Sequence, residues 1–273
     1  MFRTSGANEI MSTATSKGSP ALPADGAAVV VGGSGGLGAE ICRTLARAGS
    51  QVVLSYHSNR AAAEQVVTDI ETLGPKALAL GCDIEDPPAV KRLVDTAIER
   101  FGHVHSVVYA AGPKIEFAYI NEISPQTWAQ VMAADVNGCF NLLWAALPHL
   151  RERKSGSIVA LVTAAVDRSP PRDILSAAPK AAIQMLIRGV AREEGRNGIR
   201  ANCVGPGYIA AGLGLTTVHE HTREYVERMI KAIPLRRAGE ARDIADVVCF
   251  LLSDQSRYVT GETIRAAGGM QLS

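Results

Sequence analysis

The sequence predicts an α/β protein built on a doubly wound parallel sheet, with helices on both faces in three layers. The first observation is an uninterrupted apolar run at Val29–Val31, because a strand buried on both faces of a parallel sheet shows no polar alternation. The second is the glycine-rich turn that follows and leads directly into a helical pattern. The third is the recurrence of this strand–helix order along nearly the whole chain, which is typical of βαβ units.

The glycine-rich turn, VGGSGGLG at Val31–Gly38, predicts nucleotide binding. Gly32 permits the turn, while Gly36 and Gly38 leave room for a pyrophosphate and for close helix–strand packing. The following helix directs its amide donors and the positive end of its dipole at phosphate. A glycine turn alone is weak evidence, but here a strand precedes it and a helix follows it. We therefore expect a Rossmann-type dinucleotide-binding sheet.

The remaining elements follow in order, separated by glycine, proline and short polar links. Strands are expected at 51–55, 77–82, 104–109, 156–162 and 199–204, with a final strand near Ile264. Helices are expected at 37–48, 61–73, 87–100 and 176–196. A long helix is expected from Ser124 and Pro125, interrupted near Gly138 and closed around Pro148, and residues 164–174 are expected to form a loop.

Length and composition indicate one domain and no charged macromolecular partner. The 273 residues fit a single domain at 25–273, preceded by a flexible tail at 1–24 rich in Ser, Thr, Gly and Ala. The net charge of +1 provides no electrostatic case for nucleic acid or a membrane surface. No apolar run approaches the length of a membrane span, and the tail lacks the apolar core of a signal peptide.

The five cysteines are dispersed and contain no C-x-x-C pair. An odd, scattered set embedded in apolar segments indicates reduced thiols and a cytoplasmic location. His103 and His105 flank one expected strand without a third ligand, so no metal site is expected.

The end of the second strand favours NADP(H) as the cofactor. An enzyme that prefers NAD usually carries Asp or Glu there, because the carboxylate accepts hydrogen bonds from the ribose. Here Ser58, Asn59 and Arg60 offer donors and a positive charge suited to a 2′-phosphate. The alternative is that Arg60 simply begins a solvated helix. Asp83, at the end of the third strand, is a candidate for the adenine amino group or a cap of the next turn.

By these markers the chain resembles the classical short-chain dehydrogenase/reductase family, in its β-ketoacyl reductase-like branch, over residues 26–271. Further markers are the AAG of Ala110–Gly112, IRANCVGPG at Ile199–Gly207, and the VTG and AAGG segments near the C-terminus. The resemblance implies an NADP-type cofactor over the carboxyl ends of the strands and a homotetramer. The residues it assigns to the cofactor, together with those above, are Gly32, Ser34, Gly36, Leu37, Gly38, Ser58, Asn59, Arg60, Asp83, Ile84, Ala110, Ala111, Gly112, Lys180, Pro206, Gly207 and Ile209.

The catalytic positions depart from the family pattern of Asn, Ser, Tyr and Lys. By the resemblance, Asp135 stands at the Asn position and Thr163 at the Ser position. Ser176 stands at the Tyr position, and only Lys180 is retained. An aliphatic hydroxyl is a far weaker acid than a phenol. The expected loss is therefore the group that protonates the carbonyl oxygen.

Three interpretations stay open. The chain can be a reductase of an activated C=C bond or an imine, which needs no strong acid at oxygen. It can reduce a carbonyl through a water relay supplied by Asp135, Lys180 or the substrate. It can also be a nucleotide-binding scaffold or regulatory protein without activity. Retention of the glycine turn and of Lys180 favours an enzyme.

A few further residues are candidates with simpler alternatives. Tyr208, His219 and His221 lie in the segment expected to cover the substrate, where histidine can replace a lost acid or merely face solvent. Arg168 and Arg172 can bind an acidic substrate or be solvated. Trp128 and Trp144 are expected in the core or at a subunit interface.

Overall fold

The computed structural model describes residues 21–212 and 223–272. Seven strands form one sheet in the order β3-β2-β1-β4-β5-β6-β7, and every neighbouring pair is parallel. The strands are β1 (Ala27–Val31), β2 (Gln51–Tyr56), β3 (Ala77–Gly81), β4 (Val104–Tyr109), β5 (Gly156–Leu161), β6 (Ile199–Pro206) and β7 (Thr263–Ala266). The strand order reverses between β1 and β4, which opens a crevice at their carboxyl ends.

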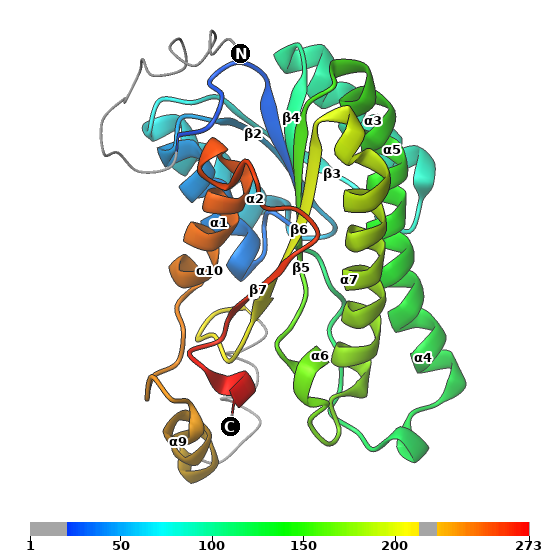
Figure 1. Cartoon of the computed structure of the whole chain (residues 1–273), viewed down its shortest axis with the longest axis vertical. Helices are drawn as coiled ribbons and strands as arrows, with labels where there is room; N and C mark the ends of the chain where they lie inside the picture. The colour runs from blue at the N-terminus through cyan, green and yellow to red at the C-terminus, as the bar shows by residue number, and fades with distance from the viewer. Residues whose placement is uncertain (1–20, 213–222, 273) are drawn as a thin grey trace, which may run out of the picture.

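Helices cover both faces of the sheet, so the predicted three-layer fold is confirmed (Figure 1). One layer holds α1 (Gly36–Arg47), α2 (Arg60–Thr72) and α10 (Ala241–Leu252), and the other holds α3 (Pro87–Phe101), α5 (Gly138–Arg153) and α7 (Ile174–Glu194). At the carboxyl end of the strands, at the bottom of Figure 1, lie α4 (Pro125–Met132), α6 (Ala165–Arg168) and α9 (Arg223–Ala232).

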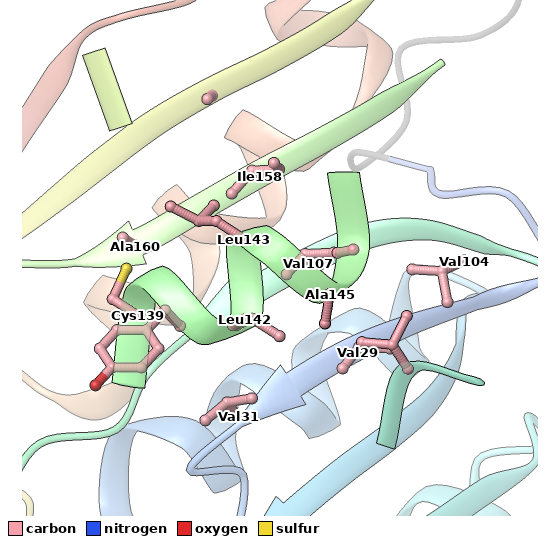
Figure 2. Close-up of a cluster of buried hydrophobic side chains, with 14 of the residues drawn as sticks. Val29, Val31, Val104, Val107, Cys139, Leu142, Leu143, Ala145, Ile158 and Ala160 are labelled. Atoms are coloured by element: carbon pink, nitrogen blue, oxygen red, sulfur yellow. The ribbon is translucent and has the colours of Figure 1, made fainter. Parts of the chain in front are cut away.

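The sheet separates two apolar clusters, which explains the uninterrupted apolar run at β1. Val29 and Val31 point toward α5 and pack with Leu142 and Ala145 (Figure 2). Ala28 and Val30 point the other way, into the cluster that contains Ile41 of α1. Because successive side chains of a strand alternate between faces, both faces of β1 have to be apolar.

The region expected as one interrupted helix contains a turn of π-helix. α4 passes into a π-helical turn at Ala133–Asn137, and α5 continues from there to Arg153. The expected end at Pro148 was wrong. Pro148 is exposed, so solvent can hydrate the carbonyl that loses its donor, and the helix beyond it is held because His149 Nε2 accepts from Val104 N at 3.1 Å.

Three other boundaries differ from expectation. The loop at 164–174 contains the short helix α6, and α7 begins at Ile174 instead of Ser176. Leu22, inside the expected tail, is only 7% exposed and its N–H donates to Ala48 O at 3.0 Å, so the packed chain reaches back at least to Leu22. None of the described helices is both long and apolar enough to span a membrane.

Candidate active site

The glycine turn between β1 and α1 forms a cradle that side chains would fill. A Cβ added at Gly38 would lie 2.1 Å from Gly32 O, and one at Gly32 would lie 2.8 Å from the backbone of Ala110. Gly32 has a φ of +79°, which favours glycine. Its N–H donates to Ser55 Oγ at 3.2 Å. No side chain caps the N-terminus of α1, so its first amides are available to an anion such as pyrophosphate.

Gly36 has a second neighbour that the sequence did not indicate. A Cβ at Gly36 would lie 2.6 Å from Gly212 N, in the segment that follows β6. The missing side chain therefore serves a close approach of two backbones as well as leaving room for phosphate. Ser34 and Leu37 are half-buried on either side of it.

The candidate 2′-phosphate residues lie in solvent beyond the end of β2. Asn59 caps α2, because its Oδ1 accepts from Ala62 N at 3.1 Å. Arg60 pairs with Glu64 of the same helix at 2.6 Å, and this contact raises the pKa of its guanidinium. Ser58 is also exposed. An exposed pair of this kind contributes little stability, so Arg60 can turn to another anion at small cost.

Asp83 and Ile84 follow β3, and Ile84 is held by contacts with α5. Asp83 Oδ1 accepts from Glu85 N at 2.9 Å, as expected of a turn cap, and stays exposed. Ile84 O accepts from the Asn141 side chain at 2.9 Å. A Cβ at Gly138 would meet Ile84 Cδ1 at 2.8 Å. Asn141 thus positions this part of the crevice, although no sequence motif singled it out.

Lys180 and Asp135 form a buried ion pair at the centre of the site. Lys180 Nζ lies 2.7 Å from Asp135 Oδ1, and the two side chains are 13% and 3% exposed. The same ammonium donates to Ala111 O at 3.3 Å. A Cβ at Gly112 would lie 3.5 Å from Lys180 Nζ. The Ala110–Gly112 segment therefore lies directly beside the Lys180 ammonium.

Tyr109 contacts both members of this ion pair and was missed by the sequence analysis. Its hydroxyl donates to Asp135 O at 2.9 Å, and it lies 3.2 Å from Ala134 O. Lys180 Nζ lies 5.5 Å from the centre of its ring. Burial first, and then the charge of Asp135, raise the pKa of this phenol well above its usual value. Tyr109 is 1% exposed, so it positions the pair and is no substitute for the lost acid.

Thr163 and Ser176 stand at the ends of the two elements that approach the pair. Thr163 follows β5, and its Oγ1 accepts from Ala165 N at 3.2 Å, which leaves its own proton free to be donated. Ser176 lies one turn before Lys180 on α7 and is half-buried. Its N–H donates to Asp173 O at 3.1 Å.

The end of β6 closes the far side of the crevice. A Cβ at Gly207 would lie 2.8 Å from Ala267, and Pro206 O accepts from Ala164 N at 2.9 Å. Ile209 is 5% exposed and its side chain packs against Gly239, so this residue is buried. Tyr208 lines a cavity of about 440 Å³ with the chain near Pro234 and Gly268.

A cavity of about 640 Å³ opens between the segment after β4 and the start of α7. Its lining residues are Lys114, Ile115, Glu116, Phe117, Thr127, Val131, Arg172 and Leu175. Arg172 has a structural role, because it donates to Phe117 O at 2.7 Å and its guanidinium lies 5.7 Å from the ring centre of Tyr119. Arg168 likewise donates to Met270 O at 2.9 Å.

The remaining candidates are two histidines, two tryptophans and a metal site. His219 and His221 lie outside the described residues. Trp128 and Trp144 are 38% and 51% exposed, which rules out the core for both and leaves the interface interpretation. Within 21–212 and 223–272 no group of three His, Cys, Asp or Glu side chains could hold a metal.

Comparison with known proteins decides the family. A family model described as Enoyl-(Acyl carrier protein) reductase matches residues 31–271. The chain is a short-chain dehydrogenase/reductase. Within this family it is 35% identical over 244 residues to an uncharacterised oxidoreductase of Methylorubrum extorquens, covering 89% of this chain and 97% of that one.

Three further proteins similar to this short-chain dehydrogenase/reductase carry named activities. A 3-oxoacyl-(acyl-carrier-protein) reductase of Staphylococcus aureus is 32% identical, covering 90% of this chain and 98% of that one. The solved structure of a levodione reductase superposes with a TM-score of 0.87 at 28% identity, over 91% of this chain and 98% of that one. An NAD+-bound xylitol dehydrogenase superposes with a TM-score of 0.84 at 28% identity, over 89% and 98%. The chain is therefore an oxidoreductase by family, with a nicotinamide cofactor.

Proposed function

We propose that this short-chain dehydrogenase/reductase is an NADP(H)-dependent reductase of a polarised double bond. The observation that carries the proposal is the Lys180 ammonium. It is held by Asp135 Oδ1 and Ala111 O at the edge of Gly112, just after β4, the strand that pairs with β1 and lies next to its glycine cradle. A buried cation is costly unless it is paired, and the family resemblance assigns this ammonium to the nicotinamide ribose.

The residues present fit a dinucleotide. The open amides of α1 and the space over Gly32 and Gly38 suit the pyrophosphate. The Lys180 ammonium suits the ribose hydroxyls, and Thr163 has a proton to donate to a substrate heteroatom. When bound, the reduced nicotinamide supplies hydride to the electrophilic carbon of the substrate. The protein's share is to orient the two reactants and to exclude water.

NADP(H) is favoured over NAD(H) by the end of β2. No carboxylate follows Tyr56 until Glu64, which is itself paired with Arg60. Rotation of Arg60 away from Glu64 would expose its guanidinium to a 2′-phosphate, and a charge-assisted contact of that kind contributes about 1.5–3 kcal/mol.

Ser176 sets the range of substrates. Without a phenol, ordinary ketones need a proton from elsewhere, whereas an activated alkene or an imine makes smaller demands on the acid. The second interpretation is that the substrate is a carbonyl compound, which is reduced through a water relay. The alternative function is a scaffold that binds the cofactor without turnover, and the observation that favours it is the absence of the phenol at 176.

Two binding titrations and one substrate panel test the proposal. NADPH and NADH are titrated against wild type, Arg60→Ala and Lys180→Ala by the change in nicotinamide fluorescence. We expect tighter binding of NADPH, a preference reduced by Arg60→Ala, and weaker binding of both cofactors in Lys180→Ala. Ketones, enones and imines are then tried as substrates with NADPH. NADH binding that equals NADPH binding contradicts the cofactor assignment, and tight binding without turnover favours the scaffold.

A homotetramer is the second part of the proposal. The apolar segment 247–252 gives it little support, because Val248 and Leu251 of α10 are 0% exposed within the chain itself and need no partner to cover them. Among the described residues, four large exposed apolar side chains lie on α4, α5 and α7: Trp128, Phe140, Trp144 and Met185. A cluster of large exposed apolar side chains on neighbouring helices is typical of an interface. The five buried free thiols support a reducing compartment such as the cytoplasm.

A further inference from the structure

Asp173 occupies the N-cap position of α7, yet its side chain does not cap the helix. An aspartate at this position usually accepts a hydrogen bond from the first-turn amides. Here only its backbone carbonyl is used, by the N–H groups of Ser176 and Ala177. Within the described part of the chain its carboxyl makes no hydrogen bond or ion pair, and the residue is half-buried. The Asp173 carboxyl therefore makes no polar contact that holds the fold together.

Asp173 lies on the same face of α7 as Ser176 and Lys180. Asp173, Ser176 and Lys180 are spaced i, i+3 and i+7, which places them along one stripe of α7. Its chain neighbours Arg172 and Leu175 line the 640 Å³ cavity. The opposite wall of that cavity is the segment that continues from Gly112, which itself lies beside Lys180 Nζ. The carboxyl, the vacated phenol position and the ammonium therefore follow one another along the same helix toward the cofactor site.

We propose that the Asp173 carboxyl is the proton donor of this enzyme and replaces the phenol missing at Ser176. This inference rests on the proposed reductase function. In the reaction, hydride adds to the electrophilic carbon and the π bond of the substrate breaks. Its electron pair moves to the heteroatom, or to the α-carbon of an enone, and that atom takes the proton from Asp173. The carboxylate that remains recovers a proton from solvent, and the nicotinamide is the group that is oxidised.

The chemistry of the position suits this role. Burial raises the pKa of Asp173 to about 6, although the N-terminus of a helix by itself stabilises a carboxylate. A general acid works best with a pKa near the working pH. The charged groups nearby in the fold are Arg172 next to it in the chain, Lys114 and Glu116 in the cavity lining, Asp167 and Arg168 on α6, which packs against α7, and the Lys180–Asp135 pair two turns along. The pair is internally neutralised, so it adds little net charge that would favour either form of the Asp173 carboxyl.

The test compares Asp173→Asn, Asp173→Glu and the matched control Asp246→Asn. Asn is as good an N-cap as Asp, and Asp246 is an exposed acid of α10, paired with Arg242. kcat, KM and the NADPH Kd are measured between pH 5 and 8 on the best substrate of the panel. We expect wild-type kcat to fall as pH rises through the Asp173 pKa, because the acid must be protonated. Asp173→Asn should lose about 10²-fold in kcat and the pH dependence, with NADPH Kd unchanged.

The outcomes distinguish a failure of this inference from a failure of the proposed reductase function. Asp173→Glu should keep a pH-dependent kcat, and Asp246→Asn should behave as wild type. Turnover in Asp173→Asn with a wild-type rate and profile overturns the role of Asp173 and leaves the reductase standing. A wild-type kcat that is flat across this range does the same without any variant. Tight NADPH binding with no turnover in wild type overturns both.

Discussion

At the scale of single residues, opposite charges in the site offset the cost of burying each other. Asp135 stands where an uncharged amide is typical of the family, and a carboxylate 3% exposed would be costly alone. The Lys180 ammonium 2.7 Å away removes that cost, and the Tyr109 hydroxyl holds the backbone of the same residue. Asp135, a departure from the family pattern, and Tyr109 thus support the one family residue that remains.

This arrangement predicts the effect of breaking the pair. Asp135→Asn leaves the Lys180 ammonium buried without its counter-charge, and we expect the free energy of unfolding to fall by about 3 kcal/mol. Lys180→Met in the Asp135→Asn background should restore most of the loss, because no unpaired charge remains. Urea unfolding of the two single variants and the double variant measures this coupling. Losses that simply add would contradict it.

At the scale of elements, the sequence predicts most of the fold because the signals are local. The apolar runs at β1, β4 and β5 and the turns at Gly74 and Gly102 depend only on neighbouring residues, so the strand–helix order follows. Contacts across the fold are different. The pairing of Tyr109 with Asp135 spans 26 residues, and depends on a π-helical turn that has no sequence signature. Asp135, Thr163 and Ser176 were reached through the family resemblance, while Asp173 required knowledge that its side chain leaves the helix uncapped.

The segment after β4 is an element whose order depends on one side chain. Arg172 has a φ of +67°, its carbonyl accepts from Ala118 N at 3.1 Å, and its guanidinium holds Phe117 O. Arg172→Ala should therefore speed amide hydrogen exchange around Ala118 by about tenfold, since a charge-assisted hydrogen bond is lost. Arg168→Ala serves as the control, because Arg168 contacts Met270 instead. Exchange at Ala118 that is equal in both variants would contradict this role.

At the scale of the whole molecule, the two ends of the sheet have different chemistry. The carboxyl end carries the site, and the amino end carries the histidines His103, His105 and His149. Burial, and then the charge of His103, lower the pKa of His105 to about 4. It is 9% exposed, with Ser50 Oγ at 3.2 Å and Ser106 Oγ at 2.9 Å. The folded protein therefore holds this ring neutral.

The pH dependence of stability follows from this difference. The unfolded histidine has a pKa of 6.5, so the unfolded state binds the proton first as pH falls. The contribution of His105 is complete above pH 6.5 and is lost as pH falls toward 4. It should cost about 2 kcal/mol of unfolding free energy between pH 7 and 5. Urea unfolding of wild type and His105→Asn at both values isolates it, and an equal pH loss in the two proteins would contradict the assignment.

Assembly is the second property at this scale. Phe140 and Trp144 of α5 are 53% and 51% exposed. Phe140→Glu with Trp144→Glu should convert the proposed tetramer to smaller species in multi-angle light scattering, because a charge in an apolar interface is costly. Leu73→Glu, also on an exposed apolar residue at 46% but in the opposite layer, should leave the mass unchanged. A wild type that is monomeric at micromolar concentration would contradict the assembly itself.

The parallel pairing of β7 with β6 has a consequence for biosynthesis. Gly207, at the end of β6, is seated against Ala267, directly after β7, and its N–H donates to Ala266 O at 3.2 Å. A nascent chain displays the glycine cradle and Lys180 long before residue 266 has left the ribosome. The wall of the site at Gly207 forms only when β7 pairs with β6. A message truncated shortly before β7 would therefore produce a chain with every residue assigned to the reaction and no closed site in which to use them.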